Sequence, residues 1–247
     1  MSLEYILGVK AGIGETFQEA EQALQKASLL KPKIVPEDSP KEAFAKTLAQ
    51  IESRKYAVVM YDGQPLEVSY DLEDVNRDAI LEAIDNLKEV AFTYGEDSLA
   101  YQALERSIEN QSYDRTTGAL TNFGYMFELC KREELSPESV LPEGVKRYIV
   151  LFDANDMHYW NSNAGYDNVT DHIAAIGKAL VDSSRGVFNI DKTDKVPDIV
   201  IRVPFVNRTH GSAGDEFMID PYCHEDHIGP VVERLVDQIY QHQKELC

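Results

Sequence analysis

The order of apolar segments after residue 145 constrains the fold more than any other feature of this sequence. RYIVLF, residues 147–152, is a short apolar run that predicts a strand, and isoleucines and leucines at helical spacing predict a helix over about 170–183. Two further runs, GVFNI and DIVIRVPFV, predict strands, and a last helix is expected from Gly229-Pro230. This order predicts an α/β or α+β fold with a mixed sheet and packed helices.

The amino-terminal part carries helix-start signals and helical periodicity. Two stretches, Thr16–Glu19 and Ser39–Glu42, have the Ser/Thr-x-x-Glu form of a capping box, in which the hydroxyl accepts from a backbone amide and the glutamate reaches back. A helix is therefore expected at each of them. Apolar stripes predict three more helices, from Asp71 onward, over about 99–108 and over 121–134.

A β-hairpin and a boundary are also expected. Residues 56–70 form two β-rich runs around an Asp-Gly pair, which favours the positive backbone angles of a tight turn. The segment 135–144 holds two prolines and a glycine, which interrupt regular structure. We therefore expect a helix-rich part with the hairpin over 1–136 and a sheet-and-helix part over 145–247, and the sequence leaves open whether these are two domains or one.

Composition disfavours several classes of function. The chain has 43 acidic and 24 basic side chains, and a net charge of −19 repels the phosphate backbone of nucleic acids. Its three cysteines include no CxxC pair, so neither a disulfide framework nor a zinc knuckle is indicated. The sequence shows no export signal and no apolar run of membrane length. We therefore expect a cytoplasmic protein, or a virion-associated one if the chain is viral, with no membrane partner.

The segment Gly8–Phe17, GVKAGIGETF, lacks residues that phosphate-binding loops require. Glu15 stands where a P-loop has lysine, and Phe17 stands where the dinucleotide-binding pattern has its third glycine. We interpret the segment as a glycine-rich turn that follows a strand over 4–9 and leads into a helix cap. Lys10 remains a candidate contact for an anion.

Asp153 and Asp156 directly follow the first strand predicted after residue 145. Open α/β sheets build sites at the carboxyl ends of buried strands, and two carboxylates there suit a hard cation such as Mg²⁺. The segment 210–227 adds nitrogen and oxygen ligands that suit a transition metal. These ligands are His210, Asp220, His224 and His227. The alternative is structural, because aspartates after a strand stabilise turns and histidines near a helix start commonly face solvent.

Tyr159, Trp160 and Tyr166 fall in a predicted polar loop over 155–168. Interleaved with asparagines, these rings suit a platform for a sugar or a peptide, because aromatic faces bind the apolar faces of polar ligands. The alternative is that they pin the loop to the body of the protein. A loop of this length suggests a role beyond connection.

Two functions of different classes agree with these patterns. The favoured one is a non-enzymatic interaction or assembly protein, for instance a subunit of a larger viral complex, with a protein partner. The other is a metal-dependent hydrolase or phosphotransfer enzyme that uses Asp153 and Asp156 with the 210–227 segment. The phosphate-binding patterns at Gly8–Phe17 lack essential residues, and no catalytic residue is assigned. No cofactor is expected except a divalent cation in the second case.

Overall fold

The computed structural model describes residues 7–29, 34–52, 57–60, 62, 77–135, 141, 143–184, 186–188, 195–204 and 213–246. Within these residues, five strands form the main sheet: β1 (Val9–Gly14), β2 (Ala57–Met60), β4 (Ile149–Ala154), β7 (Val200–Pro204) and β8 (Ala213–Ile219). Their order is β2-β1-β4-β8-β7, with β1 and β2 parallel and the other neighbours antiparallel. The predicted α/β class with a mixed sheet is confirmed.

Two small ladders and a set of helices surround this sheet. The ladders pair β3 (Val145–Arg147) with β9 (Tyr222–His224), and β5 (Gly186–Phe188) with β6 (Lys195–Pro197). The helices are α1 (Phe17–Ser28), α2 (Pro40–Glu52), α3 (Arg77–Tyr94), α4 (Leu99–Ser112), α5 (Asn122–Leu135), α6 (Met157–Ala164), α7 (Tyr166–Ser183) and α8 (Glu225–Lys244). Among the described residues, every helix is too short or too polar to span a lipid bilayer.

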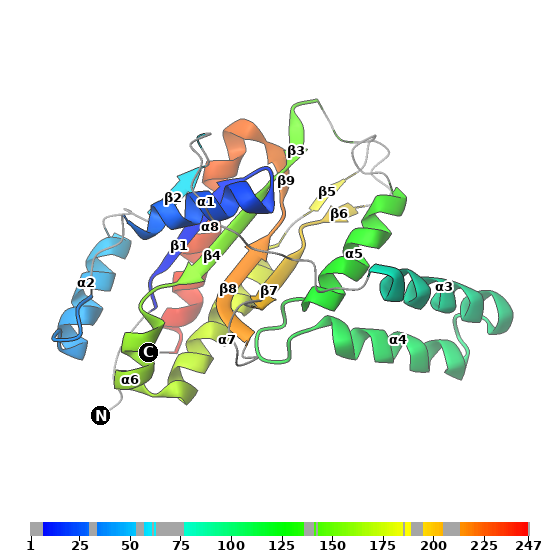
Figure 1. Cartoon of the computed structure of the whole chain (residues 1–247), viewed down its shortest axis with the longest axis horizontal. Helices are drawn as coiled ribbons and strands as arrows, with labels where there is room; N and C mark the ends of the chain where they lie inside the picture. The colour runs from blue at the N-terminus through cyan, green and yellow to red at the C-terminus, as the bar shows by residue number, and fades with distance from the viewer. Residues whose placement is uncertain are drawn as a thin grey trace.

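The sheet is covered on both faces, as the alternation of side chains in each strand requires. Helices α7 and α8 pack on one face, where the buried residues include Phe152 and Phe217. Helices α1 and α5 pack on the other face, against Leu151 and Met218 (Figure 1). The strands come from both sides of residue 136, so the helix-rich part and the carboxy-terminal part contribute to one sheet.

Helices α3, α4 and α5 form an appendage with a small core of its own. Ile80 and Ile84 of α3, Ile108 of α4, and Phe127 and Cys130 of α5 are buried together. Figure 1 shows α3 and α4 projecting from one end of the molecule, away from the main sheet. The appendage joins the body through α5, which also packs on the sheet.

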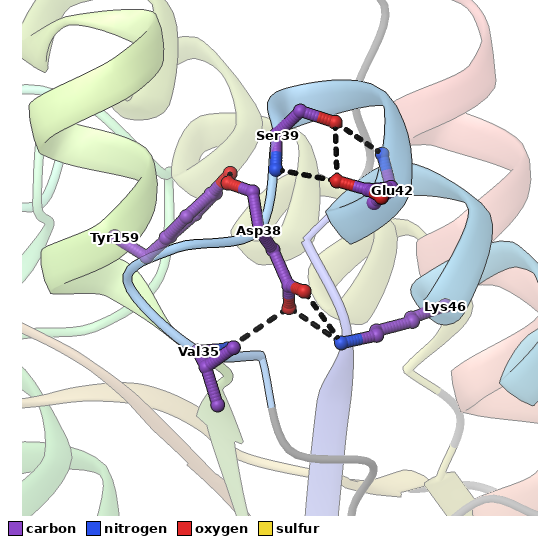
Figure 2. A network of polar contacts seen from close by, with 6 residues as sticks. All are labelled: Val35, Asp38, Ser39, Glu42, Lys46 and Tyr159. Atoms are coloured by element: carbon purple, nitrogen blue, oxygen red, sulfur yellow. Dashed lines mark hydrogen bonds and ion pairs between the residues drawn. The ribbon is translucent and has the colours of Figure 1, made fainter.

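Both predicted capping boxes are present. The hydroxyl of Thr16 accepts from the amide of Glu19, whose carboxylate accepts from the amide of Thr16. Ser39 and Glu42 make the same reciprocal pair at the start of α2 (Figure 2). The helices predicted over 121–134 and about 170–183 are also confirmed as α5 and α7.

The interpretation of GVKAGIG as a turn is wrong, because Val9–Gly14 is strand β1. Its odd-numbered residues face the core under α7 and α8, whereas Lys10, Gly12 and Gly14 face α1. A Cβ atom added to Gly12 would lie 2.1 Å from the backbone oxygen of Ala20. The glycines therefore allow α1 to pack directly on the strand backbone.

Three further expectations need correction. The predicted loop over 155–168 contains α6 and the start of α7, because the side chain of Trp160 is fully buried and holds this segment on the core. Strand β8, in the middle of the sheet, was not predicted. The last helix begins at Glu225, and Pro230 lies inside its first turns rather than at its start.

Several predicted segments reach beyond the described residues, including the start of the helix expected from Asp71 and much of the boundary segment 135–144. The first run of the predicted hairpin is β2, which pairs in parallel with β1. The second run, within 63–70, lies outside the described residues, so the hairpin stays a prediction. Residues 4–6 of the strand predicted over 4–9 also lie outside them, and Val9 belongs to β1.

Candidate functional site

Asp153, the first predicted metal ligand, lies in a row of charged side chains across three neighbouring strands. Lys10 of β1 is opposite Asp153 of β4, and Asp153 is opposite Glu216 of β8. Residues directly opposite each other in antiparallel strands project from the same face of the sheet, which here is the face that α1 covers. The ammonium group of Lys10 forms an ion pair with Asp153, and only 13% and 15% of these two side chains are exposed.

Two carboxyl groups in this region have strongly raised pKa values. Burial raises the pKa of Glu216 to about 8, and the negative charges of Asp153 and Asp215 act in the same direction. Burial also raises the pKa of Glu21, which α1 presents toward the row, to about 7. The row therefore carries less negative charge near neutral pH than its number of carboxyl groups implies.

Asp156 and Asp220 occupy separate positions. Asp156 is the N-cap residue of α6 and has a left-handed backbone with φ of 58°. Asp220 is completely buried, where its carboxylate accepts from the amide of Ile199 at 2.8 Å and from Arg147 at 2.9 Å. Arg147 also donates to the hydroxyl of Tyr125. Through these hydrogen bonds Asp220 connects α5, the β3 segment and the start of β7.

The two histidines at the start of α8 lie near each other, with ring centroids 5.9 Å apart. His224 is the N-cap residue of α8, and its Nδ1 accepts from the amide of Asp226 at 3.4 Å. His227 is exposed, and His210 lies outside the described residues. In the part of the chain that the structure describes, no group of three or more His, Cys, Asp or Glu side chains is arranged to hold a metal ion. The metal site that includes His210 stays a prediction.

We expect the melting temperature of the metal-free protein to change by less than about 1 °C when Mg²⁺, Mn²⁺ or Zn²⁺ is added. The reason is that the carboxylate of Asp153 already has the ammonium of Lys10 as its counter-charge. Thermal denaturation of EDTA-treated protein measures this. A metal site at Asp153 would be established if the metal clearly raises the melting temperature and Asp153→Asn abolishes this rise. The control variant Asp167→Asn, on the exposed start of α7, should then still show the rise.

The three aromatic residues predicted as a ligand platform do not share one surface. Trp160 is fully buried in the core, and Tyr159 meets it edge to face with ring centroids 5.1 Å apart. The hydroxyl of Tyr159 donates to the backbone oxygen of Asp38 at 2.7 Å. Tyr166 is 74% exposed at the start of α7. Tyr159 and Trp160 therefore fix α6 to the body of the protein.

Asp38 is the centre of the polar network that holds α2 against α6 (Figure 2). Its carboxylate accepts from the amide of Val35 at 2.9 Å and from Lys46 at 2.6 and 2.8 Å. The hydrogen bond from Lys46 is the main cause that lowers the pKa of Asp38 below its usual value. With the bond from Tyr159 to its backbone oxygen, Asp38 connects two helices that are distant in sequence.

A surface that the sequence patterns did not reveal lies at the tip of the α3–α4 hairpin. Phe92 is 94% exposed, Tyr94 is 67% exposed and Leu99 is 84% exposed. Gly95 forms the turn between them with φ of 84°, and Ser98 caps α4 by accepting from the amide of Tyr101. We call Phe92, Tyr94 and Leu99 the hairpin tip. A signal was present, because Phe92 and Tyr94 fall outside the apolar stripe of α3.

The hairpin that carries this tip is acidic. Residues 77–112 contain eight acidic and three basic side chains, which gives a net charge of −5. The apolar tip is therefore carried by a pair of helices with an excess of negative charge.

No protein-family model matches this chain, and a comparison with curated proteins found no significant match.

Proposed function

We propose that this chain is a non-enzymatic interaction or assembly protein that binds a protein partner through the hairpin tip. The observation that carries the proposal is the exposure of Phe92, Tyr94 and Leu99 at the end of a projecting pair of helices. Single exposed apolar residues are normal on protein surfaces. Three large ones within eight residues, on both sides of one turn, form a patch that favours binding.

The energetics favour a partner that buries this patch. Transfer of a large apolar side chain from water into a packed interface contributes about 1.5 to 3 kcal/mol. Aromatic residues are also enriched among the few residues that dominate binding energy. The helices extend to the turn and share a core with α5, so the tip is presented by a structured arm. A structured arm loses little conformational entropy on binding.

The charge of the hairpin indicates the kind of partner. A second copy of the chain would bring one acidic hairpin against another acidic surface, because each copy carries −19. A partner with an apolar pocket and a basic rim has the opposite charge and matches the tip. We therefore propose a basic protein partner.

A metal-dependent hydrolase or phosphotransfer enzyme is the second candidate. The observation in its favour is the position of Asp153 beside Glu216, near other carboxyl groups on one face of the sheet. Carboxyl groups with perturbed pKa values are typical of functional sites, although structural clusters also show them. The thermal denaturation experiment with Asp153→Asn distinguishes this candidate from the first.

The proposal predicts that partner binding is lost when the hairpin tip becomes polar. A photo-crosslinking amino acid at position 94, in the full chain expressed in its source cells, identifies the partner by mass spectrometry. The dissociation constant of the reconstituted complex is then measured by calorimetry. We expect Phe92→Ser/Leu99→Ser to weaken binding at least about 30-fold, the size of effect that two well-packed interface residues contribute.

The matched control is Leu29→Ser, since Leu29 is 85% exposed on another part of the molecule, just after α1. This variant should bind the partner as the unchanged chain does. The helix content of both variants, measured by circular dichroism, should stay constant because the altered side chains lie in solvent. Equal dissociation constants for all three proteins, or no discrete cross-linked species from position 94, would refute the proposal.

A further inference from the structure

The base of the same hairpin is hollowed into a groove. It lies between α3, α4 and α5 and has a volume of about 370 Å³. Its floor is apolar and consists of Ile84 and Leu87 from α3, Ile108 from α4 and Phe127 from α5. This volume is within the range of sites that bind ligands in proteins, and it accommodates one or two large side chains.

A second hollow of about 270 Å³ adjoins the groove on the side of the main sheet. The two hollows share Tyr113 and Glu128, and the second one is lined by Leu120 and Val200 at the edge of the sheet. Tyr113 is 50% exposed at this junction. Two adjoining hollows suit a polypeptide segment with several side chains better than a single small molecule.

Among the side chains that the structure describes, the rim of the groove is mainly negative. Glu105 and Glu109 are one helical turn apart on α4, and Glu128 lies on α5, whereas Lys88 is the one positive side chain among the described residues that line the groove. An apolar floor with an acidic rim complements a segment that has apolar residues on one face and basic residues beside them. Grooves of this type commonly bind amphipathic helices through residues at spacings of three and four.

We infer that this groove binds a basic amphipathic segment of a partner protein. The inference takes from the proposed function only that the partner is a protein. It concerns a surface distinct from the hairpin tip. The segment places leucine-like side chains on the floor formed by Ile84, Leu87 and Phe127, while its lysines or arginines face the rim carboxylates. A second copy of this acidic chain brings the wrong charge to the rim.

The probe for this site is a 14-residue model peptide in which leucines at helical spacing are separated by lysines. Two counterparts test the components of recognition: one has serine in place of leucine, and the other has glutamate in place of lysine. We expect the leucine–lysine peptide to bind the full chain at least about ten-fold more tightly than either counterpart, because each lacks one of the two matching features. Fluorescence anisotropy at physiological salt measures these affinities.

Variants of the protein locate the binding. Glu105→Lys/Glu109→Lys reverses two exposed rim charges and should weaken peptide binding at least about ten-fold. Glu82→Lys/Glu89→Lys makes the same charge change at exposed positions of α3 that do not line the groove, and it should weaken binding less than about two-fold. Phe92→Ser/Leu99→Ser should bind the peptide normally, which separates this site from the hairpin tip.

Any of the following results would overturn the inference. Equal weakening by the two charge-reversal pairs would show attraction by overall charge alone, and similar affinity for the serine peptide would show that the floor is not used. A change in the sedimentation mass of the purified chain on Glu105→Lys/Glu109→Lys, without a change in peptide affinity, would assign the groove to a second copy. If the tip variant loses partner binding and the unchanged chain does not bind the peptide, the proposed function is supported and this inference is refuted.

Discussion

Gly12→Ala is expected to destabilise the folded chain by at least about 3 kcal/mol. The new Cβ atom would lie 2.1 Å from the oxygen of Ala20, 2.2 Å from the nitrogen of Leu24 and 2.7 Å from its Cα. These are backbone atoms of α1, so no side-chain rotation relieves the overlap. The helix has to move outward by roughly 1 Å, which separates Ala20 and Leu24 from the core on that face of the sheet.

Urea unfolding followed by circular dichroism measures this effect, with Gly229→Ala as the matched control. A Cβ atom at Gly229 meets nothing within 4 Å, and this residue lies inside α8. Helix propensity favours alanine over glycine, whereas the ring of Pro230 disfavours a Cβ atom on the preceding helical residue, so the stability of the control should stay within about 1 kcal/mol of the unchanged chain. If Gly12→Ala unfolds at the same urea concentration as the unchanged chain, the direct packing of α1 on β1 is wrong.

The same glycines show why part of the fold was misread from the sequence. Glycines before a helix cap are typical of a turn, and the local pattern of Gly8–Phe17 gives no sign of a neighbour. The decisive contact comes from α1 folding back over β1, which depends on tertiary structure. By contrast, the capping box of Thr16 and Glu19 was predicted correctly, since it involves only residues three apart.

Helix α6 and strand β8 were missed for a related reason. MHYWNSNA has the composition of a polar loop, and it becomes helical where Trp160 is inserted into the core. AGDEFMI contains glycine and two acidic residues, which are poor strand formers, but β4 and β7 supply hydrogen-bonding partners on both sides of it. In both segments, packing against distant residues outweighs local propensity.

The candidate sites show the same contrast between local sequence patterns and tertiary contacts. Asp153 was identified as a residue of interest from its position after a strand, but its neighbours Lys10 and Glu216 depend on the register of three strands far apart in sequence. The hairpin tip was missed because helical periodicity directs attention to the buried stripe of a helix. The residues that fall outside the stripe, such as Phe92, carry the interaction in our proposal.

The raised pKa of Glu216 in the charged row predicts that the free energy of unfolding falls as the pH rises. The pKa of this carboxyl is about 8 in the folded chain, against an ordinary value of 4.5 that we take for the unfolded chain. Below 4.5 the group is protonated in both states and has no effect on stability. Between 4.5 and 8 the unfolded chain releases this proton while the folded chain retains it, so unfolding becomes progressively more favourable. Above 8 this loss of stability is complete.

We expect Glu216→Gln to remove this contribution, because glutamine resembles the protonated carboxyl in shape and never ionises. At pH 9 the variant should be more stable than the unchanged chain by about 2 kcal/mol, a value below the full shift because solvent partly screens the group. At pH 4 the two should be equal. Urea unfolding across this range measures the difference, with Glu233→Gln on the exposed face of α8 as the matched control. A profile of Glu216→Gln parallel to that of the unchanged chain would show that Glu216 ionises in the folded state as it does in water, and that the row with Lys10 and Asp153 is open to solvent.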